Sequence, residues 1–204
     1  MKTRYVWIFD PGHGGVIDGV PQTAGKRSPD WDKGVLYEGV MNRIIANKTK
    51  KLCDDAGYCV INSVSGDKDV SLSSRVRLEN RLYKTHKKKT IFLSFHCDAF
   101  HKESASGWSA FTYFGQSDSD KVADVLYKHA KKSKFKIRVD ETDGDLDKEE
   151  NFYILRKTLG PAVLIENFFM TNKKDYDFLM SEKGQNKIAN TIFNAIKEIE
   201  ENGI

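Results

Sequence analysis

The fold is decided near the N-terminus by the stretch RYVWIFDPGHGG, residues 4–15. Its first half is a short run of β-branched and aromatic residues, which is typical of a buried strand. The run leads directly into the turn DPGHGG, residues 10–15, whose glycines allow other groups to approach the backbone closely. We therefore expect a strand at residues 4–9, with His13 projecting just beyond its C-terminal end.

Similar apolar runs recur along the chain and alternate with segments of helical periodicity. This alternation is typical of an α/β sheet with helices on its faces. The expected strands lie at residues 4–9, 58–63, 90–96, 107–114, 151–155 and 162–167. The expected helices lie at about 38–56, from 71 onward, at 118–132 and at 185–201, with irregular surface loops at 16–35 and 140–150. One domain spanning residues 1–204 is the expectation for this length.

Composition and charge exclude several classes of protein. The 204 residues are 39% hydrophobic and 30% charged, a globular balance, and no apolar stretch approaches the roughly 20 residues that span a bilayer. The net charge of +4 is mild, and the lysine runs at 87–89 and 131–132 are not interleaved with aromatic residues. We expect these runs to be solvated helix ends, with no nucleic-acid partner and no membrane insertion. Three cysteines without a CxxC pair argue against a disulfide framework or a structural zinc knuckle.

Ionisable side chains stand at three strand ends. His13 follows the first strand, His96 ends the run IFLSFH at 91–96, and Glu166 ends the run PAVLIE at 161–166. Such a group is costly at the end of an apolar strand unless it is paired, bound to metal or solvated in a cleft. Ligands of open α/β sheets bind beyond the C-terminal strand ends, and Glu38 reaches this edge in the first turn of its helix.

Two imidazoles and one carboxylate with an open fourth position form a catalytic zinc site. Water in such a site has its pKa lowered towards about 7, and a further carboxylate can then move its proton to a leaving amine. Each residue alone is weak evidence, because a single histidine at a strand end is more often a structural residue. The pattern of residues therefore predicts a zinc-dependent hydrolase only when all the positions are taken together.

In order along the chain, the motifs resemble those of the zinc-dependent N-acetylmuramoyl-L-alanine amidases of the type 3 family, which occur in cell-wall remodelling enzymes and phage endolysins. The matching motifs are DPGHGG at 10–15, Glu38 with Asn42, Ile45 and Ala46, DVSLSSR at 69–75 leading to Asn80, LSFH at 93–96, Gly107, and PAVLIENFF at 161–169 before Asn172. The resemblance implies that His13, Glu38 and His96 bind one Zn²⁺ per chain and that Glu166 is the catalytic acid/base. It assigns no substrate-binding residue.

The same resemblance implies the architecture, the reaction and the partners. The fold would be three-layer α/β, with a twisted, mostly parallel sheet of about six strands and helices on both faces. The reaction would be hydrolysis of the amide between N-acetylmuramic acid and L-alanine, on peptidoglycan or its fragments. We separately expect the protein to be a monomer. The N-terminal segment differs from a secretion signal. We therefore expect synthesis in the cytoplasm without a signal peptide, and action on the wall after release as a lysin or by non-Sec export.

The chain departs from the family pattern at two places. Glu38 follows His13 by 25 residues, so residues 16–35 form an inserted loop, in which Asp18, Asp30 and Asp32 are competing carboxylate ligands. Glu38 is preferred because the helix pattern after it matches. Cys97 stands where a small residue is usual, and strand alternation predicts that it points away from His96 and is buried and inert.

The role of Arg75 and two alternative functions of the whole protein are also to be considered. Arg75 is expected to have a structural role, pairing with Asp67 or Asp69. A zinc peptidase acting on free or wall peptides would use the same metal chemistry, although co-catalytic aminopeptidases need a second metal and more carboxylates. A non-catalytic wall-binding protein would keep the fold without turnover, but the presence of Glu166 gives no sign of that loss.

Overall fold

A computed structural model of the protein describes residues 3–86, 89–142 and 144–204. The strands are β1 (Val6–Pro11), β2 (Val16–Ile17), β3 (Val20–Pro21), β4 (Cys59–Asn62), β5 (Thr90–Asp98), β6 (Ser109–Thr112), β7 (Lys148–Glu149) and β8 (Ala162–Phe169). The helices are α1 (Glu38–Asp55), α2 (Leu72–Thr85), α3 (Asp118–Lys132), α4 (Tyr153–Lys157), α5 (Lys173–Met180) and α6 (Glu182–Asn202).

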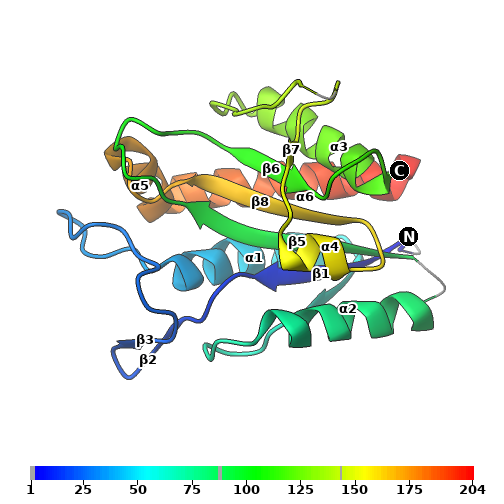
Figure 1. Ribbon diagram of the computed structural model, residues 1–204, viewed down its shortest axis with the longest axis horizontal. Helices are drawn as coiled ribbons and strands as arrows, with labels where there is room; N and C mark the ends of the chain where they lie inside the picture. The colour runs from blue at the N-terminus through cyan, green and yellow to red at the C-terminus, as the bar shows by residue number, and fades with distance from the viewer. Residues whose placement is uncertain (1–2, 87–88, 143) are drawn as a thin grey trace.

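The main sheet has six strands in the order β4-β1-β5-β8-β6-β7 (Figure 1). Its first four strands are parallel, whereas β6 is antiparallel to β8 and β7 is parallel to β6. The expected mostly parallel sheet of about six strands is therefore confirmed. Because four parallel strands run in the same direction, β1, β5 and β8 bring their C-terminal ends to one edge.

Helices cover both faces of this sheet, which gives the predicted three layers (Figure 1). Helices α1, α3 and α6 pack on one face over a large core that includes Trp7, Phe95 and Trp108. Helices α2 and α4 pack on the other face over a smaller cluster that includes Phe92 and Leu164. Strands buried on both faces are nearly continuously apolar, as the runs in the sequence are.

The expected strand at 151–155 is wrong. Residues Tyr153–Lys157 form helix α4, and the edge strand that pairs with the outer side of β6 is β7, formed by Lys148–Glu149. Ile154 and Leu155 are buried in the cluster beneath α2. A short apolar run can be either a strand or a buried helical turn, and tertiary packing decided this one. Helix α5 and the β2–β3 hairpin were not expected.

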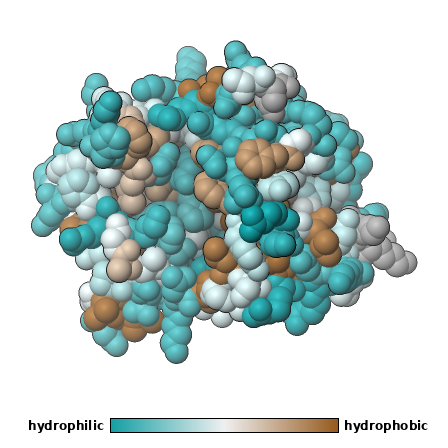
Figure 2. Space-filling model, viewed as in Figure 1, coloured by the Kyte–Doolittle hydropathy of each residue, from teal (hydrophilic) through white to brown (hydrophobic). Residues whose placement is uncertain are grey.

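The surface is mainly hydrophilic, with scattered hydrophobic side chains on the face shown in Figure 2. Among the helices of the described residues, none combines the length and hydrophobicity needed to cross a membrane. Lys131 and Lys132 are exposed in the last turn of α3, as expected for a solvated helix end. Residues 87–88 of the other lysine run, and residue 143 of the acidic loop, lie outside the described residues.

Candidate metal centre and active site

The structure brings His13, Glu38 and His96 together at the C-terminal edge of the sheet. One possible ligand atom from each residue lies within 4.8 Å of the others. Glu38 Oε1 is 2.9 Å from His96 Nδ1 and 3.3 Å from His13 Nε2. The two imidazole rings are nearly perpendicular, at 88°. Two histidines from strand ends thus face one carboxylate from the start of helix α1.

Glu38 is buried, with 2% of its surface exposed, although it carries a carboxylate. Burial alone would raise the pKa of this carboxyl, but hydrogen bonds and charge from His13 and His96 outweigh burial and hold the pKa below its ordinary value. The Asn42 side chain donates to Glu38 Oε1 at 3.4 Å and to the Gly12 carbonyl at 3.1 Å. The carboxylate is therefore ionised and fixed in place beside the histidines.

The turn after β1 is shaped for close approach. A Cβ atom at position 12 would lie 2.1 Å from the His96 ring, and one at position 39 would lie 1.9 Å from the Gly14 carbonyl oxygen. His13 itself has a φ of 62°, in the left-handed region that non-glycine residues rarely adopt. Backbone strain of this kind concentrates at functional sites. Glycines therefore allow the turn, the imidazole of His96 and the start of α1 to meet.

Glu166 lies beside this cluster. It pairs in register with His96 across the parallel strands β5 and β8, so the two side chains leave the sheet on the same face. Its Oε2 atom is buried and has no hydrogen-bond partner within the described part of the chain. Burial, and then the charges of Glu38 and Asp98, raise the pKa of Glu166 well above its ordinary value. This carboxyl is thus adjacent to the cluster and chemically distinct from Glu38.

A sequence profile described as N-acetylmuramoyl-L-alanine amidase matches residues 8–198, nearly the whole chain. The chain belongs to this amidase family. The expected family is therefore confirmed. So is the expected reaction, hydrolysis of the amide between N-acetylmuramic acid and L-alanine of peptidoglycan, which this zinc-dependent family carries out.

Individual relatives of the amidase are distant in sequence. It is 24% identical to the germination-specific N-acetylmuramoyl-L-alanine amidase of Bacillus subtilis, covering 92% of this chain and 76% of that protein. It is 27% identical to the endolysin of Bacillus phage SPP1, covering 97% and 66%. It spans only 57% of the length of the probable cell wall amidase LytH of Staphylococcus epidermidis. The crystal structure of an N-acetylmuramoyl-L-alanine amidase from Clostridium difficile 630 superposes with a TM-score of 0.80 at 26% identity, covering 98% and 99% of the two chains.

The donors of the amidase fit zinc. Two imidazole nitrogens and one carboxylate oxygen are the mixed ligand set of catalytic zinc sites, and Oε1 of Glu38 is shared between both histidines at hydrogen-bond distance. The competing carboxylates of the loop lie elsewhere: Asp18, Asp30 and Asp32 are exposed, and Asp32 pairs with Lys173 at 2.8 Å. Position, and not residue type, separates Glu38 from them.

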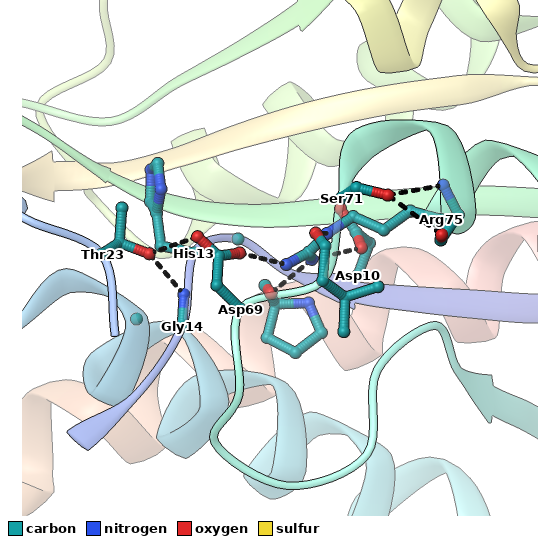
Figure 3. Close-up of polar contacts among 12 residues, drawn as sticks. Asp10, His13, Gly14, Thr23, Asp69, Ser71 and Arg75 are labelled. Carbon is teal, nitrogen blue, oxygen red and sulfur yellow. Dashed lines mark hydrogen bonds and ion pairs between the residues drawn. The ribbon is translucent and has the colours of Figure 1, made fainter. Parts of the chain in front are cut away.

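Arg75 has a structural position, but its main partner differs from the expectation. Its guanidinium contacts Asp10 Oδ1 at 2.7 Å, and both side chains are buried (Figure 3). The expected contact with Asp69 exists at 3.5 Å, whereas Asp67 pairs with Arg43 instead. The expectation overlooked Asp10 because it lies 65 residues away in sequence. The pair ties the start of α2 to the turn that carries His13.

The inserted loop at 16–35 is attached to the site at two points. The Thr23 hydroxyl accepts from the Gly14 amide at 2.8 Å and donates to Asp69 at 2.6 Å (Figure 3). The Lys26 carbonyl accepts from the Glu38 amide at 2.9 Å, and the Lys26 ammonium lies 3.9 Å from Glu38 Oε2. Sequence reasoning missed Lys26, because it lies twelve residues before the start of α1 and only the folding back of the loop brings it to Glu38.

Cys97 is buried, as expected from strand alternation, with 2% exposure in the core beneath α1 and α6. Burial raises the pKa of its thiol well above the ordinary value. The open side of the site is a different region, a cleft of about 290 Å³ lined by His13, His96, Asp69, Arg75 and Ile154 among others. The thiol is thus separated from the cleft, and a cysteine-hydrolase mechanism has no support.

Proposed function

We propose that this chain is a single catalytic domain, residues 1–204, that holds one Zn²⁺ through His13, Glu38 and His96 and uses Glu166 as its acid/base. The observation that supports the proposal is the convergence of two imidazoles and one carboxylate from three separate segments at the open edge of the sheet. Peptidoglycan or its fragments would be the substrate, and the active form would be a monomer without a nucleic-acid partner.

Zinc bound at this site would supply Lewis-acid chemistry, which polarises a carbonyl group and makes water a usable nucleophile at neutral pH. His13 and His96 would bind as neutral imidazoles, so that each offers a nitrogen lone pair. Asn42 donates to Glu38 and to the Gly12 carbonyl, and thereby orients the carboxylate relative to the turn that carries His13.

Glu166 would move the proton. Its buried Oε2 atom has no hydrogen-bond partner among the described residues. This oxygen is therefore free to accept a proton from the attacking water. The raised pKa of this carboxyl favours holding that proton until it passes to the amide nitrogen of L-alanine, which leaves as an amine. The positive charge of Lys26 opposes the rise in part.

The proposal can be tested on purified, zinc-loaded protein incubated with peptidoglycan, beside a chelator-treated control. Mass spectrometry should find free stem peptides that begin with L-alanine, and glycan strands of unchanged length, only in the zinc-loaded sample. Cuts inside the stem peptide would instead indicate a zinc peptidase. Binding without any cut, across several wall types, would indicate a non-catalytic wall-binding protein.

A further inference from the structure

A second group of acidic side chains lies away from the zinc site, at the junction of β6, α3 and the loop before β7. Asp120, Asp145 and Asp147 each offer an oxygen within 4.8 Å of the others. Asp120 is in the first turn of α3, and the other two come from the acidic loop at 140–150. In the antiparallel β6–β8 ladder, Phe111 pairs with Leu164 and Ser109 with Glu166. Thr112, which ends β6, therefore lies away from the catalytic edge of the sheet.

The hydroxyl of Thr112 lies between two of these carboxylates. Its Oγ1 atom is 2.5 Å from Asp147 Oδ2 and 3.1 Å from Asp120 Oδ1. A hydroxyl carries one proton and can donate only one hydrogen bond. With both carboxylates ionised, one of the two short contacts would bring lone pairs against lone pairs, so the arrangement calls for a proton or a cation among the oxygens.

Asp147 is the most deeply buried member of the group, with 1% of its surface exposed. Its other oxygen, Oδ1, is buried and has no hydrogen-bond partner among the described residues, and the same holds for Asp145 Oδ1. A buried carboxylate oxygen without a partner costs free energy. Two such atoms in one acidic cluster leave both oxygens free to bind a cation.

The charge around the group is negative. No lysine or arginine of the described chain comes within ion-pair distance of Asp120, Asp145 or Asp147. One oxygen of each of the three carboxylates lies within 4.8 Å of the others, and a cation at the centre of the group would balance their negative charge.

We propose that Asp120, Asp145 and Asp147, with the Thr112 hydroxyl, bind one Ca²⁺ per chain. Calcium takes oxygen ligands in adaptable geometry, often several of them from one acidic loop, whereas zinc prefers nitrogen and sulfur, and magnesium keeps several waters. The ion would join the loop at 140–150 to the end of β6 and the start of α3. Its role would be to hold the edge of the sheet together, separately from hydrolysis.

The test uses the zinc-loaded full chain in metal-depleted buffer, titrated with CaCl₂. Calorimetry should give one saturable site per chain. The melting temperature should rise by about 5–10 °C at a calcium concentration about 100 times Kd. Asp147→Asn and Asp145→Asn should each abolish the rise while leaving the zinc content at one. Asp118→Asn is the matched control, because it removes the same charge from an exposed residue of α3 that pairs with Lys121.

Three results would overturn the proposal. The first is a wild-type protein that neither binds CaCl₂ in calorimetry nor changes its melting temperature. The second is a calcium response that Asp147→Asn retains in full. The third is an equal response to MgCl₂ at the same concentrations. Because the calorimetry uses only the wild-type chain, the proposal can be decided even if a variant fails to fold.

Discussion

The imidazole of His96 lies against the backbone of Gly12 so closely that a Cβ atom at position 12 would come within 2.1 Å of its Cε1 atom. Gly12→Ala should therefore displace His96 and lower zinc affinity and amidase activity together, by about 10–100-fold as for other groups that orient metal ligands. Zinc per chain by elemental analysis, measured with turnover, checks this expectation. An alanine variant with full zinc content and full activity would show that the ring can move aside without consequence.

Replacing a ligand should remove the metal and the stability that it provides. His13→Ala is expected to lose stoichiometric zinc, activity and the part of the melting temperature that depends on zinc. His129→Ala is the control, because this histidine pairs with Glu198 at 2.9 Å, at the contact between α3 and α6. A His13→Ala protein that keeps one zinc and full activity would contradict the ligand assignment.

Substitutions of Glu166 and Glu38 should have different effects, because the two residues have different proposed roles. Glu166→Gln keeps the shape of the side chain but cannot accept and release a proton, so we expect turnover to fall by about 10²–10⁴-fold with zinc still bound. Glu38→Gln weakens a ligand and should lose zinc as well as activity. Turnover with peptidoglycan and elemental analysis of both variants provide the comparison. Near-normal turnover by Glu166→Gln would remove it from the mechanism.

Breaking the buried pair between Arg75 and Asp10 should destabilise the fold. Arg75→Met leaves the Asp10 carboxylate buried without its cation, and we expect the free energy of unfolding to fall by about 3–5 kcal/mol. Lys51→Met, which breaks an exposed pair with Asp55, should cost less than about 1 kcal/mol. Urea unfolding measures both variants. Equal effects would mean that the burial of the first pair is unimportant.

The reactivity of each cysteine thiol should depend on how deeply the residue is buried. Cys53 and Cys97 are buried, and burial raises the pKa of Cys53 to about 12, so alkylation of the native protein at mildly alkaline pH should modify Cys59 first. Peptide mapping identifies the labelled residue. Cys97→Ser is expected to stay active, and its inactivity would revive a role for the thiol.

Much of the fold could be predicted from local patterns. Strands β1, β5 and β8 are long apolar runs, and helices α1 and α3 carry clear apolar stripes, so their types followed from periodicity. The run at 151–155 failed because four or five apolar residues fit either a strand or one helical turn. Its outcome depended on packing beneath α2, which no local pattern contains.

The sequence by itself determined the candidate donors and their order: His13, His96 and Glu166 at strand ends, and Glu38 at the start of a helix. Only the tertiary structure decided which carboxylate faces both imidazoles, that Arg75 pairs with Asp10, and that three aspartates and Thr112 gather at the far end of β6. The physical reason is that periodicity depends on which side of a local element is buried. An ion pair or a ligand set depends on how segments distant in the chain approach one another, and the packing of the whole sheet fixes that approach.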